Sequence, residues 1–106
     1  QNWQQAVLLL EEMQAVAVMP DVIILNSVIS LCGKSKQWQR ALAVLQEIRD
    51  AGMNPDIISF TAAISACQHG GHWEQALSVL NQIHTSGLTP EVASFNAAIS
   101  ACEKAG

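Results

Sequence analysis

A repeat of 35 residues runs through the chain and constrains its fold more than any other feature. Every Trp, every Pro and every Cys recurs at this spacing, and four further positions keep one residue type in three successive units. The first three sets are Trp3/Trp38/Trp73, Pro20/Pro55/Pro90 and Cys32/Cys67/Cys102. A period of this length predicts one supersecondary unit per repeat, and neighbouring units stack to bury a continuous core.

Within one unit, residues 22–56, the hydrophobic pattern predicts two helices. Apolar side chains recur every three or four residues over roughly 24–34 and again over roughly 38–51, the spacing of an amphipathic helix. The predicted core stripes are Leu25, Val28, Ile29 and Cys32, then Trp38, Ala41, Leu42, Leu45 and Ile48. In the next unit they are Phe60, Ala63, Ile64 and Cys67, then Trp73, Ala76, Leu77, Leu80 and Ile83.

The residues between the stripes predict where the helices begin and end. Gly52 follows the second helix of its unit, at the place where a left-handed residue often ends a helix. We expect Ser59 and Ser94 to cap the N-termini of the first helices, and Ile24 to be a poorer cap. Ala17 stands where later units have Gly, so the helix before it should end less cleanly.

The expected fold is all-α: an alpha-alpha superhelix, a right-handed solenoid of antiparallel helix pairs. Residues 1–21 form a C-terminal half repeat, 22–56 and 57–91 are full repeats, and 92–106 form an N-terminal half repeat. The chain starts at Gln1 rather than Met, so we interpret it as an excerpt of a longer protein. No uninterrupted apolar run reaches the roughly 18 residues of a membrane span, so we expect no membrane contact.

The junction between units resembles that of pentatricopeptide repeats, in their standard 35-residue form. The segment from Gly52 to Thr61 has the pattern Gly-x-x-Pro-Asp-Ile-x-x-Phe-Thr, and the segment from Gly87 to Asn96 repeats it with Glu, Val and Asn. Tetratricopeptide repeats, of about 34 residues, carry Trp and Tyr in their first helix. This chain has no Tyr, and its Trp residues open the second helix.

Stacked first helices would place equivalent residues in columns about 8–10 Å apart. The columns are polar, Asn26/Thr61/Asn96; acidic, Asp21/Asp56/Glu91; apolar, Ile23/Ile58/Ala93; and basic, Lys34/His69/Lys104. Amides, hydroxyls and carboxylates can recognise base edges, apolar side chains can stack on a base, and cations can bind phosphate. The pattern therefore fits single-stranded RNA, with one base per repeat.

The resemblance implies more definite roles for these residues. In pentatricopeptide repeats the polar residue early in the first helix and the last residue of the repeat jointly select a base. By that rule Asn26 with Asp56 selects uracil, and Thr61 with Glu91 selects a purine. Guanine is favoured over adenine there, although Glu departs from the family's Asp. Asn96 implies a pyrimidine, and the order along the chain implies RNA bound 5′ to 3′.

The acidic, polar and basic columns also have a plainer interpretation. Asp21 closes a unit whose first helix is absent from the sequence, and the acidic column could serve only to favour helix N-termini. The polar and basic columns could be solvated surface. The serines at 30, 65 and 100 are better explained as spacers, and the three Trp as part of the core or of the packing between repeats.

The cysteines and histidines predict no metal site. The Cys residues lie on the core stripe of successive units, farther apart than the Cα separation of about 4.4–6.8 Å that a disulfide allows, so we expect buried free thiols. Cys67, His69 and His72 are close in sequence but lack the second pair of a zinc site. No phosphate loop or nucleophile beside a base suggests an enzyme.

Two functions remain open from the sequence. The resemblance implies single-stranded RNA binding in a mitochondrion or chloroplast, in RNA processing, stability, editing or translation, with other RNA-processing proteins as further partners and no cofactor or small-molecule substrate. A net charge of −4 instead favours a protein-interaction scaffold of tetratricopeptide type. Only base recognition predicts the pairing of an amide or hydroxyl with an acid in each unit.

Overall fold

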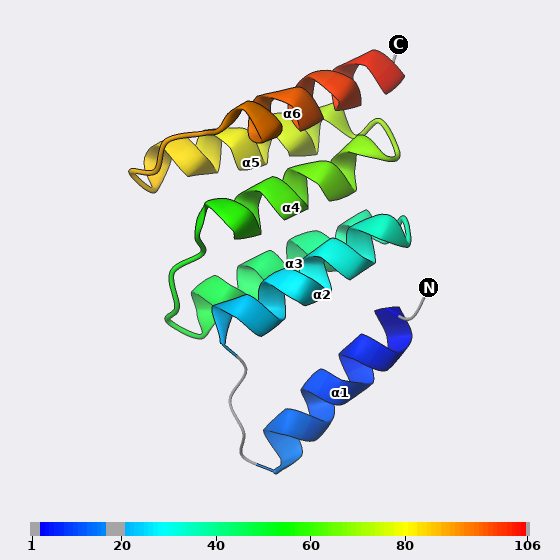
Figure 1. The fold of residues 1–106 in the computed structure, drawn as a ribbon, viewed down its shortest axis with the longest axis vertical. Coiled ribbons are helices and arrows are strands. Elements are labelled where there is room, and N and C mark those ends of the chain that lie inside the picture. Colours follow the sequence, from blue (N-terminus) through cyan, green and yellow to red (C-terminus); the bar gives the residue numbers. More distant parts are fainter. Residues whose placement is uncertain (1–2, 17–20, 106) are drawn as a thin grey trace.

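Six helices make up the described residues, 3–16 and 21–105, of the computed structural model, which contain no strand (Figure 1). They are α1 (Trp3–Ala15), α2 (Val22–Lys34), α3 (Trp38–Asp50), α4 (Ile57–Gln68), α5 (Trp73–Thr85) and α6 (Val92–Lys104). The sequence predicted this alternation of second and first helices. The predicted effect of Ala17 on the end of α1 lies outside the described residues.

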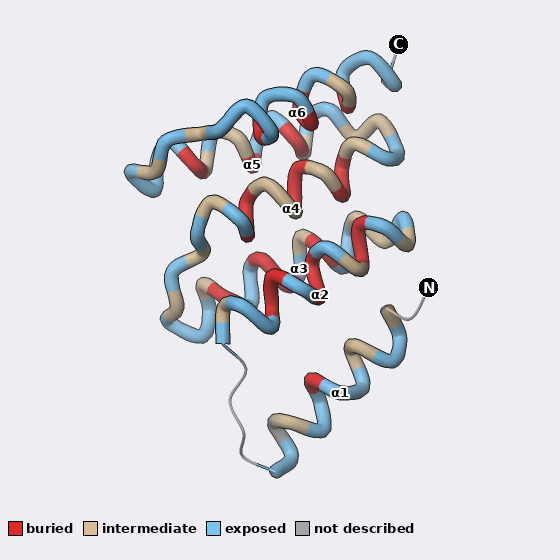
Figure 2. Tube along the Cα trace, viewed as in Figure 1, coloured by how far each residue is buried: buried red, intermediate tan, exposed pale blue. Residues whose placement is uncertain are grey.

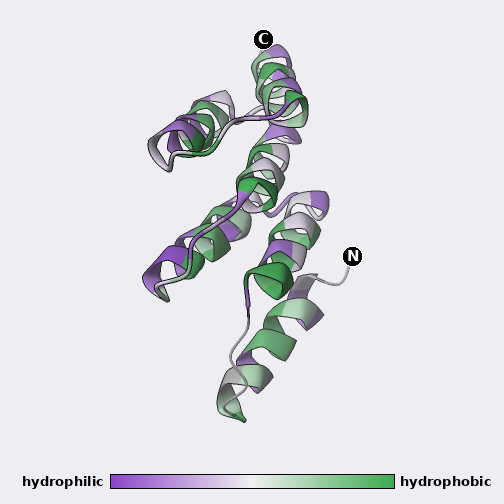
Figure 3. Ribbon diagram, turned by 60° about the vertical axis from the view of Figure 1, so that its left-hand side comes forward, coloured by the Kyte–Doolittle hydropathy of each residue, from purple (hydrophilic) through white to green (hydrophobic). Residues whose placement is uncertain are grey.

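The helices lie in two layers. Helices α2, α4 and α6 lie side by side in one layer, and α3 and α5 lie in the other (Figures 1 and 3). Helices α2 and α4 each pack on the second helix of their own unit, as in α2 with α3, and on the first helix of the next unit, as in α2 with α4. Helix α1 contacts α2. The α2–α4–α6 layer therefore carries the columns predicted from the sequence.

The predicted stripes form the core where a neighbouring unit covers them. All four stripe residues of α2 and all four of α4 are buried, and Phe60 and Ile64 are fully enclosed (Figure 2). The prediction is wrong for Trp73 and Leu77 of α5, which are 43% and 41% exposed. Both residues lie on a face that a further helix pair would cover, since burial in a repeat array depends on the next unit.

The N-terminal caps differ from the prediction. The capping residues are Asp21, Asp56 and Glu91, so Ser59 and Ser94 stand three residues inside their helices. Asp56 Oδ1 accepts the N–H of Ser59 at 3.0 Å, and the Ser59 hydroxyl accepts the N–H of Asp56 at 3.1 Å, which is a capping box. Both residue types cap helices well, and the one with extended backbone takes the role.

The prediction that α2 begins with a poor N-terminal cap is also wrong. Asp21 has extended backbone, and its Oδ1 accepts the N–H of Ile24 at 2.9 Å. The cap therefore comes from the acidic column, three residues before the position at which we looked for it.

Glycine ends the second helices as predicted. Gly52 has φ +80°, and the N–H groups of Gly52 and Met53 donate to the carbonyls of Arg49 and Ile48, each at 3.0 Å. This is a Schellman motif, and Gly87 and Leu88 repeat it after α5. The half-buried side chain of Met53 packs against the core beside it.

The cysteines are free thiols, and two of the three are buried as predicted. Burial raises the pKa of the Cys67 thiol to about 11 and also raises that of Cys32, although Arg40 opposes the second shift. The prediction of burial is wrong for Cys102, which is exposed on the outer side of α6.

Tryptophan packs between units at two of its three positions. Trp38 stacks on His72 of the following unit with ring centroids 4.1 Å apart, and Arg40 of α3 lies 4.5 Å from the ring centroid of Trp3. The predicted role in packing between repeats is confirmed for these two residues.

None of the six helices, over the ranges given above, has the length and apolarity needed to cross a bilayer.

We predict opposite effects on stability at two left-handed positions. Gly52→Ala forces a side chain onto φ +80° and should lower the free energy of unfolding by about 1–2 kcal/mol. Lys36→Gly should raise it by about 1 kcal/mol, because Lys36 is exposed and has φ +62°. Urea unfolding followed by circular dichroism measures both. A destabilised Lys36→Gly variant would contradict the prediction.

Candidate nucleic-acid interface

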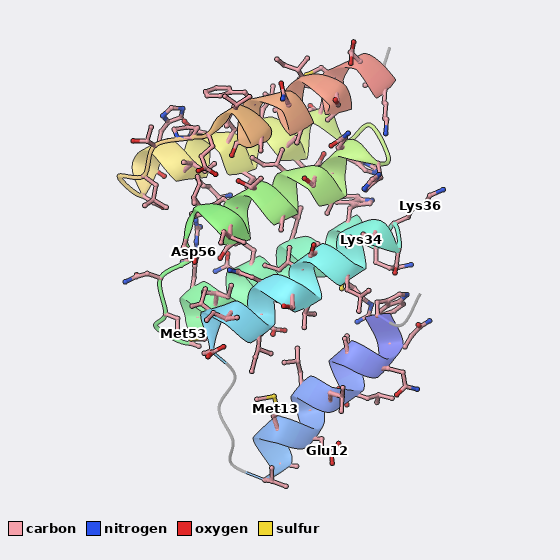
Figure 4. All side chains as sticks on the ribbon, viewed as in Figure 1. Glu12, Met13, Lys34, Lys36, Met53 and Asp56 are labelled. Carbon is pink, nitrogen blue, oxygen red and sulfur yellow. The ribbon has the colours of Figure 1, made fainter. Side chains whose placement is uncertain are left out.

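The candidate site lies on the α2–α4–α6 layer, with acidic and basic groups at opposite ends of its helices. Asp21, Asp56 and Glu91 stand at the N-termini of these helices, and the basic column stands at the C-terminal ends. Figure 4 labels one residue of each kind, Asp56 and Lys34. A helix of this length separates the two ends by about 18 Å. The predicted apolar residues, Ile23, Ile58 and Ala93, are all exposed beside the acidic end.

Asn26 and Asp56 meet across the junction between α2 and α4. The Nδ2 of Asn26 donates to Oδ1 of Asp56 at 3.1 Å. The Ser59 hydroxyl donates to Oδ1 of Asn26. Asn26 was predicted on an open surface stripe, but it is only 7% exposed because the start of α4 covers it. The structure thus brings together the two residues that the sequence paired, and adds a third.

Hydrogen bonds favour the ionised form of the Asp56 carboxylate. Burial alone would raise its pKa, but bonds from the Ser59 backbone, the Asn26 amide, the Ser59 hydroxyl and the Ile58 backbone together lower the pKa below its ordinary value. Near neutral pH the group is therefore an acceptor and not a donor. It can bind an imino or amino N–H.

A hollow of about 300 Å³ lies directly over this pair. Ile23 and Ile58 line it together with Asn26 and Asp56, and two serines of α2 complete it. Ile58 is 62% exposed and Ile23 is 75% exposed, which is unusual for isoleucine. The hollow therefore combines apolar side chains with an amide and a carboxylate, the combination that a flat heterocycle with a polar edge requires.

The next junction is built differently. The hydroxyls of Thr61 and Ser94 are 2.8 Å apart and share a hydrogen bond. Glu91 caps α6 by its backbone position, with no side-chain bond to the helix. The structure therefore brings Thr61 to Ser94 rather than to Glu91. Asn96 is exposed on α6, and Asp21 is exposed at the start of α2, where its side chain caps the helix.

The basic column borders a second hollow, of about 190 Å³, between α2 and α4. Lys34 and His69 line it, with Ser30 and Ser65 among the other residues. The helices approach closely at its floor, where a Cβ on Gly33 would lie 3.0 Å from the Cβ of Ala66. Lys34, His69 and Lys104 are all exposed, so the structure leaves these cations accessible.

Sequence reasoning missed the part that Ser59 and Ser94 play in the site. Both were assigned to helix caps alone, yet both are fully buried and each contacts the polar residue of the preceding unit. The signal available was their own 35-residue spacing beside an acidic cap.

Over residues 3–16 and 21–105, no three His, Cys, Asp or Glu side chains gather as metal ligands.

We predict that Asp56 adds a pH-dependent increment to stability. Because its pKa is lower in the folded state, the increment is complete above the unfolded value, about 3.9, and is lost as pH falls through the folded value. Asp56→Asn keeps a good cap without a titrating group. Urea unfolding should show a wild-type advantage at about pH 6 that shrinks by about pH 3. An equal advantage at both values would contradict the prediction.

Comparison with known proteins places the chain in a family. The sequence profile of the pentatricopeptide repeat domain matches residues 43–105, more than half of the chain, and a profile for the PPR repeat matches residues 23–53. No curated protein matches the sequence closely enough to count as a relative.

Solved structures share the fold. Pentatricopeptide repeat protein PPR10 in complex with an 18-nt psaJ RNA element has a TM-score of 0.88 and 22% identity, over 97% of this chain and 15% of that chain. A cysteine-to-serine variant of PPR10 with the same RNA element gives the same values. PPR10 from maize gives a TM-score of 0.81 and 21% identity, over 99% and 15%.

The present chain thus spans about 15% of the length of these proteins. At such low identity the likeness establishes the architecture, an all-α superhelix of repeated helix pairs. With the matches of the two profiles, it leads to one conclusion: the chain belongs to the pentatricopeptide repeat family.

Proposed function

We propose that the chain is part of an array that binds single-stranded RNA and recognises one base per repeat. The observation that carries this proposal is the meeting of Asn26 and Asp56 beneath a hollow flanked by Ile23 and Ile58. PPR10, which shares the fold, has been crystallised with an RNA element. The role is passive and non-enzymatic: the array occupies RNA and blocks or recruits other RNA-processing proteins.

The groups at the first junction match the edge of uracil. Asn26 has a second N–H beyond the one that it donates to Asp56, and Asp56 has a second oxygen, Oδ2. A donor beside an acceptor is complementary to a carbonyl oxygen beside an imino N–H, which is what uracil presents. Ile23 and Ile58 would hold the flat faces of the base.

The second and third positions follow the same logic. Thr61 and Glu91 would contact a purine, with guanine favoured, and Asn96 would contact a pyrimidine. Asp21 would close the unit before the first, and Ala93 would provide the apolar surface at α6. Lys34, His69 and Lys104 would meet the phosphates between bases. By family resemblance we assign the parent protein to a mitochondrion or chloroplast, in RNA processing, stability, editing or translation.

One observation favours a different function. The net charge of −4 opposes a polyanion, and a groove that holds a peptide would be the alternative, as in tetratricopeptide scaffolds. The few cations of the interface imply weak RNA binding by so short a chain. Peptide binding, however, gives no reason for an ionised acid paired with an amide beneath an apolar hollow.

We expect the 106-residue chain to prefer RNA with uracil at the base that faces Asn26 and Asp56. Fluorescence anisotropy at low salt, with labelled 5′-UGC-3′ and its three variants at the first base, measures this preference. Asn26→Thr should shift it from uracil towards guanine by about threefold to tenfold, since about one hydrogen bond changes. Asn81→Thr, the same change on the exposed face of α5, is the matched control. Equal binding of all four RNAs would refute base recognition and favour the scaffold.

We expect Lys34→Ala to weaken binding to all four RNAs by the same factor. A phosphate contact carries no base information, and its loss should reduce the slope of log affinity against log salt by about 0.7. Lys36→Ala is the control, because it removes the same charge from a residue that does not line the hollow beside His69. A loss confined to one RNA would show that Lys34 contacts a base instead.

A further inference from the structure

We propose that Ser59 is a positioning residue, which locks the amide of Asn26 in the one orientation that leaves a donor for the base. Ser94 plays the corresponding part for Thr61. In each case the serine belongs to the unit that follows the one containing the residue that it orients. This inference rests on the proposed function, because it concerns how the same residues present themselves to RNA.

The first observation is a closed ring of hydrogen bonds at the α2–α4 junction. Asn26 Nδ2 donates to Asp56 Oδ1 at 3.1 Å, and the backbone N–H of Ser59 donates to the same oxygen at 3.0 Å. The Ser59 hydroxyl completes the ring by donating to Asn26 Oδ1. This hydroxyl also lies 3.0 Å from Asp56 Oδ1, but it has a single proton, and Asn26 Oδ1 is the nearer acceptor.

This ring admits one orientation of the Asn26 amide. If the amide were flipped, its oxygen would face the carboxylate of Asp56, and neither group could donate. The hydroxyl of Ser59 would then lose its nearest acceptor. Asn26 is 7% exposed and Ser59 is fully buried, so water cannot readily replace a lost partner. In such surroundings an unmatched polar group is costly, and the satisfied orientation prevails.

The locked amide determines what a base meets. The Oδ1 of Asn26 is turned towards Ser59, and one N–H is turned towards Asp56, which leaves the second N–H as the donor. A rotating amide would offer an oxygen as readily as an N–H. It would then accept from the amino group of cytosine as well as donate to a carbonyl of uracil. Ser59 therefore contributes to selectivity without contacting RNA.

The second observation is that the contact of the serine with the preceding unit recurs 35 residues later. Ser94 is fully buried, and its hydroxyl lies 2.8 Å from that of Thr61. The acids differ between the junctions, Asp56 in one and Glu91 in the other, and so do the polar residues. The serine and its contact with the preceding unit are what the two junctions have in common. The capping bond between the Asp56 N–H and the Ser59 hydroxyl does not require the contact of Ser59 with the preceding unit.

A comparison of Ser59→Ala with Ser94→Ala separates positioning from capping. Both remove a buried hydroxyl from the third residue of a first helix, but each releases a different partner, Asn26 or Thr61. Labelled 5′-UGC-3′ and its variants at the first and second bases give two preference ratios for each protein. In parallel, NMR measures hydrogen exchange of the Asn26 side-chain amide in the free 106-residue chain.

We expect Ser59→Ala to lower the preference for uracil over cytosine at the first base by about threefold to tenfold, with the second base unaffected. Ser94→Ala should change the second base alone. Exchange of the Asn26 side-chain amide should accelerate by a similar factor in Ser59→Ala and stay unchanged in Ser94→Ala. If Ser59→Ala fails to fold, the Ser94→Ala ratios test the same idea at the other junction.

Two results would overturn the inference. Equal weakening of all RNAs by both variants, with unchanged exchange at Asn26, would show that neither serine orients the polar residue of the preceding unit. A second-base change caused by Ser59→Ala would show that the effect is not local. If the wild type shows no base preference, the proposed function fails. The exchange data alone then decide whether Ser59 orients Asn26.

Discussion

The structure depends on each helix pair leaving an apolar face that only the next pair can cover. Phe60 and Ile64 of α4 are fully buried, whereas their equivalents Phe95 and Ile99 of α6 are 43% and 59% exposed. Burial of this face supplies the main driving force for stacking units. It also fixes how far apart the first helices lie, so the spacing of the surface columns is a consequence of core packing.

The same stacking makes every candidate site a property of two units. Asp56 caps α4, and in the same position its carboxylate accepts a bond from Asn26 of α2. Asp56, the last residue of its unit, therefore caps the first helix of the next unit and completes the polar surface of its own unit. The close approach of Gly33 to Ala66 brings the helices near enough for such contacts. The pair lies within the repeat 22–56, but α4 of the next unit holds Asp56 in place, because Asp56 is its N-cap.

The sequence predicted the features that depend on periodicity. It failed for the burial of residues covered by a neighbouring helix and for the helix caps, which depend on the local backbone conformation. The stripes of α2 and α4 follow from spacing alone, and the pairing of Asn26 with Asp56 followed from the family resemblance. The burial of Asn26 and the exposure of Cys102 are set by which helix lies alongside. Ser59 could not be placed, because Asp and Ser cap equally well and the backbone decides between them.

The two junctions differ in how far they are prepared for a ligand. At the first, the amide, the carboxylate and the hydroxyl hold one another, so the side chains lose little further freedom when a base arrives. At the second, the side chain of Glu91 makes no capping bond to α6, so a ligand would have to order it. Ordering a long side chain costs free energy on binding. In the proposed role, the Asn26–Asp56 junction is therefore the more selective, and the Thr61–Glu91 junction the more permissive.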